Sequence, residues 1–190
     1  IKKEFISCNR LGLEYLNIHP GAHKEQSKDR GLKQICESLN SIKDYVGKVT
    51  LLFENTSGSG SVLGSTFEEL KFLLENTDFS CGVTLDTCHL FTSGYDISSE
   101  ETLENTVSSF DKIVGLENLK LIHLNDSQGE LNSKKDRHEH IGLGKIGPSG
   151  FKAIVNHDYL KNIPMIMETP VNEKRGDKEN IIFLKEMIEI

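Results

Sequence analysis

The chain has 190 residues, with a hydrophobic content of 36% and a charged content of 27%. This composition suits a globular domain with a sizeable core, and no apolar run approaches the ~20 residues of a membrane-spanning helix, so we expect no membrane partner. The formal net charge of −7 argues against a basic nucleic-acid binder, although bound divalent cations would offset it. The four cysteines form no C-x-x-C pair, which argues against a disulfide framework or a thiolate zinc motif.

Hydrophobic runs alternate along the chain with segments that have helical spacing. The expected strands are 13–19, 49–54, 81–86, 119–123 and 164–168. The expected helices are 1–11, 27–46, 66–75, 98–114, 149–156 and 178–190. Thr66 with Glu69, and Ser98 with Glu101, have the spacing of a capping box. Repeated strand–helix units of this kind favour a parallel α/β sheet.

Each predicted strand ends in a side chain that binds metal ions in proteins. These side chains are His19, Glu54, Asp86, His123 and Glu168. The carboxyl ends of parallel strands meet at one face of a β/α barrel, which is where barrel enzymes carry their sites. A TIM barrel has eight strands and typically ~250 residues, so we expect a parallel (β/α) barrel of TIM type, of which about five of eight units are present. We interpret 1–190 as a single domain, the C-terminal part of a barrel that lacks its first strands.

Three further residues extend the candidate metal site. His89 follows Asp86 across a turn, and Asp136 and His138 lie two apart in a long loop. Imidazole and carboxylate groups without thiolates suit Zn²⁺, Mn²⁺ or Fe²⁺. A single Asp after a strand is often only a helix N-cap, but ligands on five successive strands favour a shared metal site.

The remaining candidates have weaker signals. Cys88 is expected to be a small buried residue, and His157 a surface residue at a helix end. His23 and His140 either orient metal ligands or lie on the surface. The stretch Gly58, Ser59 and Gly60 offers main-chain N–H groups to a phosphate, and the planar guanidinium of Arg137 suits phosphate oxygens; ordinary loop roles remain open for both.

Five motifs resemble the endonuclease IV family of apurinic/apyrimidinic endonucleases. They are N-I-H-P-G, E-N-T-x-G-x-G, D-T-C-H-x-F-x-x-G-Y-D, H-L-N-D-S and D-R-H-E-H-I-G-x-G-x-I-G. The resemblance runs from about Leu11 to the C-terminus and implies a xylose-isomerase-like barrel with three zinc ions. It implies that His19 binds the first ion and that Glu54, the catalytic residue, bridges the first and second. Further ligands of the second ion would be Asp86, His123 and Glu168, and those of the third His89, Asp136 and His138.

The function implied by the resemblance is DNA repair. The expected reaction hydrolyses the phosphodiester on the 5′ side of an abasic site in double-stranded DNA and leaves a 3′-hydroxyl, with Gly58, Ser59, Gly60 and Arg137 contacting the DNA. We expect a monomer inside the cell, in the cytoplasm of a bacterium or the nucleus or mitochondrion of a eukaryote. The family pattern includes a further His ligand on an earlier strand that this sequence lacks, so activity of this chain alone is open. The alternatives are a metal-dependent sugar isomerase or epimerase on the same barrel, and a non-catalytic remnant.

Overall fold

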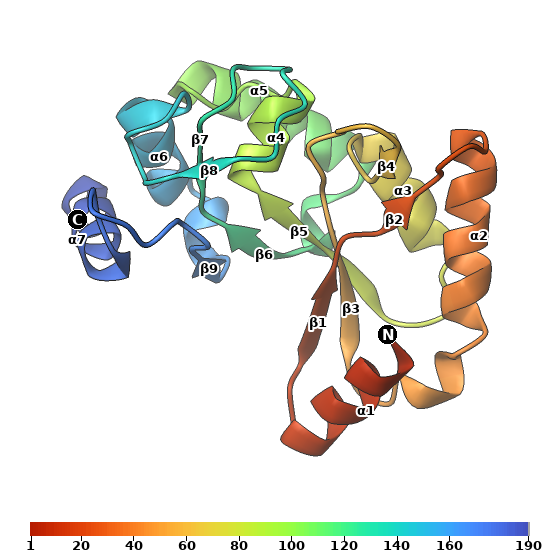
Figure 1. Ribbon diagram of the computed structural model, residues 1–190. Coiled ribbons are helices and arrows are strands. Elements are labelled where there is room, and N and C mark those ends of the chain that lie inside the picture. The colour runs from red at the N-terminus through yellow and green to blue at the C-terminus, as the bar shows by residue number, and fades with distance from the viewer. Residues whose placement is uncertain (190) are drawn as a thin grey trace.

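A computed structural model describes residues 1–189, and its centre is a parallel sheet of five strands. In spatial order the strands are β1 (Tyr15–Ile18), β3 (Thr50–Glu54), β5 (Cys81–Asp86), β6 (Leu119–His123) and β9 (Met165–Ile166). Every neighbouring pair is parallel. The sheet curves, and its edge strands β1 and β9 lie apart from each other (Figure 1). The expected strands and their order are therefore confirmed, as an incomplete α/β barrel.

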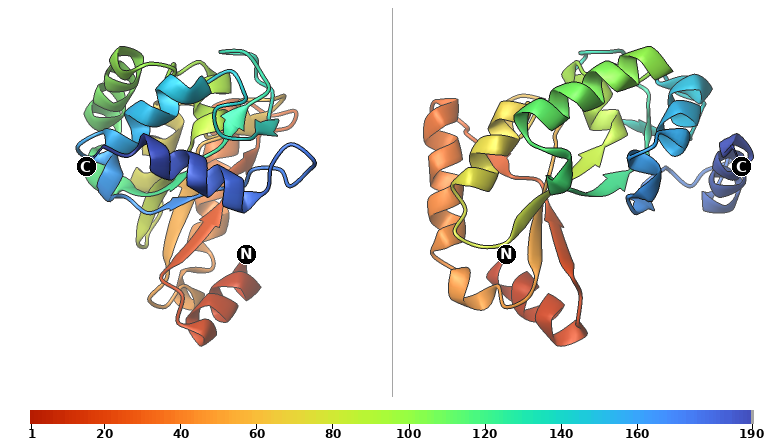
Figure 2. Two further views of the ribbon diagram at one scale, coloured as in Figure 1. Left: turned by 90° about the vertical axis from the view of Figure 1, so that its left-hand side faces the viewer. Right: turned by 180° about the vertical axis from the view of Figure 1, so that it is seen from behind.

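The helices follow the outer side of this curved sheet. They are α1 (Lys2–Leu11), α2 (Lys28–Asn40), α3 (Phe67–Glu75), α4 (Thr87–Ser93), α5 (Glu100–Ile113), α6 (Gly147–Asn156) and α7 (Asp177–Met187). Seen from behind, α2, α3, α5 and α6 succeed one another in chain order, each packed on the next (Figure 2). Short 3₁₀ turns occupy Lys43–Tyr45, Leu116–Asn118 and Leu160–Asn162. None of the helices between residues 1 and 189 is long and apolar enough to cross a membrane.

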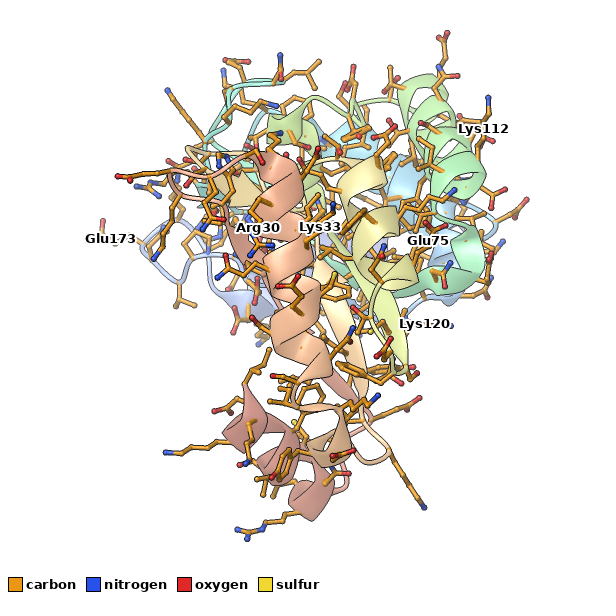
Figure 3. The ribbon with its side chains drawn as sticks, turned by 90° about the vertical axis from the view of Figure 1, so that its right-hand side faces the viewer. Arg30, Lys33, Glu75, Lys112, Lys120 and Glu173 are labelled. Atoms are coloured by element: carbon orange, nitrogen blue, oxygen red, sulfur yellow. The ribbon has the colours of Figure 1, made fainter. Side chains whose placement is uncertain are left out.

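The core lies between the helices and the outer face of the sheet. Its largest fully buried side chains are aromatic, namely Phe5, Phe53, Phe67, Phe110 and Phe151. The opposite faces of the helices are charged, as Arg30 and Lys33 on α2 and Lys112 on α5 illustrate (Figure 3). This division between apolar and charged helix faces is what the helical spacing of the sequence predicted.

Several predicted helix boundaries were wrong, and side-chain hydrogen bonds accompany two of the differences. The helix expected at 98–114 begins at Glu100, because the Ser98 hydroxyl and N–H both bind Asp96; the capping box is formed by Ser99 and Thr102. The helix expected at 27–46 ends at Asn40. At this point the Asn40 side chain accepts the main-chain N–H of Asp78 at 2.8 Å, in the segment that follows α3. The last predicted helix, 178–190, is present as α7, but it ends at Met187; residues 188 and 189 are not helical, and residue 190 lies outside the described residues.

Several short elements had no clear sequence signal. Helix α4 begins directly after β5, because the Asp86 carboxylate accepts the N–H of His89 at 2.8 Å and caps the helix. Two antiparallel pairs close the long loops: β2 (Gly21–Ala22) with β4 (Val62–Leu63), and β7 (Asp126–Ser127) with β8 (His138–Glu139). These pairs fold the loops back over the carboxyl ends of the strands. All four cysteines are free, as their spacing predicted.

Candidate metal centre

All eight predicted metal-binding residues belong to one cluster at the carboxyl ends of the strands. They fall into overlapping groups in which one potential ligand atom from each residue lies within 4.8 Å of the others. The groups are His19 with Glu54 and His89; Glu54 with Asp86, His123 and Glu168; His89 with Asp136 and His138; and Asp86 with Cys88 and His138. Strand register explains the arrangement, because Asp86 pairs with His123 and both side chains project from the same face of the sheet.

Glu54 lies at the centre of this cluster. Its Oε1 is 3.5 Å from His19 Nε2, 3.5 Å from His89 Nδ1 and 3.2 Å from His123 Nδ1. Burial acts to raise the pKa of this carboxyl group, but hydrogen bonds to His123, His19 and His89 outweigh burial and lower the pKa well below its ordinary range. Glu54 is thus an ionised, buried carboxylate that faces three imidazoles, and this geometry suits a ligand shared between ions.

A second part of the cluster is formed by His89, Asp136 and His138. Asp136 Oδ1 lies 3.1 Å from His89 Nε2 and 3.6 Å from His138 Nε2. The Nδ1 atoms of these histidines face main-chain carbonyl oxygens, of Asn55 at 3.0 Å and of Glu168 at 3.2 Å. A carbonyl oxygen only accepts, so each Nδ1 carries a proton. Both Nε2 atoms are buried and face the Asp136 carboxylate, and two imidazole nitrogens beside a carboxylate fit a divalent cation.

In the metal-free cluster, positively charged imidazoles lie beside negatively charged carboxylates. Burial acts to lower the pKa of His89, but the carboxylates of Asp136, Asp86 and Glu54 outweigh burial and raise the pKa to about 11. The hydrogen bond to His89 lowers the pKa of Asp136. The pKa of His123 is also raised, because Glu54 and Glu168 outweigh its burial. Excess negative charge in the site therefore attracts positive charge, which protons supply when no metal is bound.

Three asparagines beside the ligands were missed at the sequence level. Asn17 donates through Nδ2 to Glu54 Oε2 at 2.6 Å. The Asn55 side chain binds both polar groups of the Asp86 main chain. Its Oδ1 accepts the Asp86 N–H at 2.6 Å, and its Nδ2 donates to the Asp86 carbonyl oxygen at 3.2 Å. Asn125, which follows β6, is fully buried. A signal existed, because strand alternation puts Asn17 on the same face as His19, and Asn55 directly follows a predicted ligand.

Asp126 was also missed, and it organises the loop that follows His138. Its carboxylate is fully buried and accepts main-chain N–H groups at 2.7–3.3 Å. The donors are Ser127, Gly142, Gly144, Ile146 and Gly147. Gly144 passes so close that a Cβ there would lie 2.5 Å from Asp126 Oδ1, so this position requires glycine.

The other singled-out residues have different surroundings. Cys88 is buried, as expected, and burial raises its pKa to about 12. His140 is fully buried, with Asn172 and Asn180 at its two ring nitrogens, so a surface role is wrong for it. His157 lies at the end of α6, as predicted, but its side chain is only 16% exposed, and its Nδ1 accepts the main-chain N–H groups of Tyr159 and Leu160.

The predicted DNA-contacting residues lie in two loops beside the cluster. Gly58 and Gly60 have φ angles of 76° and 58°, and Ser59 and Gly60 are exposed. A Cβ on Gly58 would lie 3.3 Å from Lys134 Cδ, so the two loops are in contact. Arg137 is exposed, and its guanidinium donates to the carbonyl oxygen of Asp136 at 2.7 Å. Contact of these residues with DNA stays a prediction.

Comparison with known proteins yields consistent matches. The model of the xylose isomerase-like TIM barrel family matches residues 1–187. A probable endonuclease 4 of Thermosipho africanus is 45% identical over 169 residues, which is 88% of this chain and 60% of that protein. The corresponding Haloarcula marismortui protein is 41% identical over 187 residues, 98% of this chain and 67% of that protein. The chain thus spans about two thirds or less of the length of these relatives.

The solved structures agree with the sequence relatives. The crystal structure of endonuclease IV from Thermus thermophilus superposes with a TM-score of 0.79 and 34% sequence identity, covering 98% of this chain and 64% of that one. The strand order, the strand-end ligands and these matches have one explanation. The chain belongs to the xylose isomerase-like TIM barrel family and, within it, to the endonuclease IV proteins.

Proposed function

We propose that the full-length protein is a metal-dependent DNA repair endonuclease that hydrolyses the phosphodiester on the 5′ side of an abasic site. The observation that carries this proposal is the position of Glu54 Oε1, within 3.5 Å of nitrogens from His19, His89 and His123. A carboxylate in that position suits a cluster of several ions, which is the type of centre that phosphodiester hydrolysis uses. The relation to endonuclease IV proteins supports the same reaction.

We assign the ligands of three ions in the full-length protein. Glu54 is shared between the first and second ions, and His19 completes this chain's contribution to the first. Asp86, His123 and Glu168 are the remaining ligands of the second ion, and His89, Asp136 and His138 hold the third. The donor set contains only imidazole and carboxylate groups, for which Zn²⁺ is the expected ion and Mn²⁺ or Fe²⁺ are workable substitutes.

The bound ions would lower the pKa of water and neutralise charge on the scissile phosphate. The residues of this chain prepare that chemistry. Hydrogen bonds to three histidines keep the pKa of Glu54 low, and Asn17 orients its carboxylate by donating through Nδ2 to Oε2 at 2.6 Å. His89 and His138 keep their protons on Nδ1, toward main-chain carbonyls, so their Nε2 atoms are available to a cation. The half-exposed side chains of His19, Asp136 and Glu168 leave the site open to a substrate.

The substrate we propose is double-stranded DNA with an abasic site. The abasic nucleotide has to leave the helix to bring its phosphate to a site at the end of a barrel, and a nucleotide without a base does so at low cost. Arg137, which directly follows a proposed ligand, would contact a backbone phosphate. Main-chain N–H groups of Gly58, Ser59 and Gly60 would contact another. We expect the full-length protein to act as an intracellular monomer.

A direct assay uses a labelled duplex that carries one abasic site. The metal-loaded full-length protein should cut one strand on the 5′ side of the lesion and leave a 3′-hydroxyl that a DNA polymerase extends. Chelation should stop the reaction, and an undamaged duplex should stay intact. Cleavage on the 3′ side, or isomerisation of a free sugar without incision, would instead favour another activity of the same barrel.

A further inference from the structure

We propose that Asn125 is a positioning residue that sets the geometry of the second metal-ion position. The inference deepens the proposed function and rests on the metal centre assigned above. Asn125 is fully buried just after β6. Its side chain contacts two of the residues that share this position, Asp86 and Glu168, and no ion is needed for either contact.

The side-chain amide of Asn125 uses both of its ends. Nδ2 donates to Asp86 Oδ2 at 2.5 Å, and Oδ1 accepts the main-chain N–H of Glu168 at 2.9 Å. The two neighbours define which end is nitrogen, because a carboxylate requires a donor and an N–H requires an acceptor. A single planar group thereby ties the end of β5 to the segment that follows β9.

The main chain of Asn125 is itself held in place. Thr87, the first residue of α4, accepts the Asn125 N–H at 2.8 Å and donates to the Asn125 carbonyl oxygen at 2.7 Å through its hydroxyl. Asp86 is in turn held from the other side by Asn55, which bonds both polar groups of its main chain. The Asn125 amide therefore has little freedom to turn away from the carboxylate it contacts.

These contacts leave Asp86 oriented but still able to bind an ion. Oδ1 accepts the His89 N–H and Oδ2 accepts the Asn125 amide, and each carboxylate oxygen retains a further lone pair. Groups that orient metal ligands in this way typically contribute 10- to 100-fold to metal affinity. Only an amide serves here, since it supplies the donor for Asp86 and the acceptor for Glu168 at once.

The test compares Asn125→Asp with Asn118→Asp in the full-length protein. Asn125→Asp retains the acceptor for Glu168 and replaces the donor to Asp86 by an oxygen. Asn118 is the matched control at the other end of β6, where its amide donates to the Val114 carbonyl oxygen at 2.6 Å. Zn²⁺ affinity is measured by competition with a chromophoric chelator, and ligand geometry by the visible absorption of the Co²⁺-loaded protein.

We expect Asn125→Asp to weaken the affected Zn²⁺ site about 10- to 100-fold and to change the Co²⁺ spectrum, whereas Asn118→Asp leaves both as in the wild type. If Asn125→Asp does not fold, Asn125→Ala supplies the same comparison without a new charge. A variant with a lower melting temperature but wild-type affinity and spectrum would overturn the positioning role. A wild-type protein that binds no Zn²⁺ would reject the metal centre itself, which is a distinct result.

Discussion

The Nδ1 atom of His89 lies 3.0 Å from the main-chain carbonyl oxygen of Asn55, and this contact turns the opposite ring nitrogen toward Asp136. The residue that follows Glu54, the proposed shared ligand, thereby orients His89, a proposed ligand of a different ion. Asn55 also binds the main chain of Asp86. Asn55, at the end of β3, is thus a neighbour in sequence or a hydrogen-bond partner of residues from all three proposed ion positions.

Metal binding should release protons. The pKa of His89 is raised to about 11 in the metal-free protein, so at neutral pH a cation has to displace the proton on Nε2. Metal affinity should therefore fall as the pH falls and rise as the pH rises toward 11. Calorimetric titration of Zn²⁺ in two buffers with different ionisation enthalpies measures the protons released. Heats that do not depend on the buffer would contradict this protonation state.

Glu54→Gln should nearly abolish incision of abasic-site DNA, while the protein stays folded. The substitution removes the negative charge that faces three imidazoles, and a loss of several kcal/mol of transition-state stabilisation corresponds to a rate at least ~100-fold lower. Glu75→Gln, at the exposed end of α3, is the control and should cut at the wild-type rate. Wild-type turnover by Glu54→Gln would remove Glu54 from the centre of the mechanism.

Asp126→Asn should destabilise the protein. One oxygen that accepts main-chain N–H groups becomes a donor in a fully buried position, and each polar group left unpaired costs about 1–3 kcal/mol. For a chain of this size every kcal/mol lowers the melting temperature by about 2–4 °C. Asp158→Asn is the control, because its side chain is 99% exposed, and a surface change of this kind stays within about 0.5 kcal/mol. Equal melting temperatures for the two variants would show that Asp126 does not hold its loop.

Arg137→Ala should weaken DNA binding without changing the metal content. Loss of one phosphate contact lowers the slope of the salt dependence of binding by about 1. The measurement uses fluorescence anisotropy with an abasic duplex at several salt concentrations, in the Glu54→Gln background that should prevent cutting. Arg30→Ala, on the outer face of α2 (Figure 3), is the control and should bind as the parent does. An unchanged slope for Arg137→Ala would exclude the phosphate contact.

Much of the fold could be predicted because its signals are local. The five strands lie in predominantly apolar runs that each end in a polar residue, and the capping residue Thr66 lies where the sequence places it. Helix α4 could not be found in this way, because it is only seven residues long and its capping residue Asp86 is also a candidate ligand. The two-residue strands β7 and β8 pair across a loop of ten residues, and main-chain partners of the buried Asp126 lie about 20 residues along the chain, so neither leaves a local signal.

The candidate ligands stand out in the sequence, whereas most of the contacts that hold them do not. His19, Glu54 and His123 each close an apolar run, so their chemistry stands out in the sequence. Strand alternation places Asn17 on the ligand face, but only the folded chain shows its contact with Glu54. Asn125 has no such signal, and only the folded chain brings it to Asp86. Burial of His140 was equally hidden, since its partners belong to the segment before and within α7.

The number of ions per molecule tests the central claim most directly. Elemental mass spectrometry of the purified full-length protein, with the protein concentration from amino-acid analysis, should give three divalent ions for the wild type. His138→Ala removes a proposed ligand of the third ion alone and should give two. A wild-type content of one ion would contradict the three-ion centre and favour a sugar isomerase or epimerase on the same barrel, and a content that His138→Ala leaves unchanged would remove His138 from the third ion position.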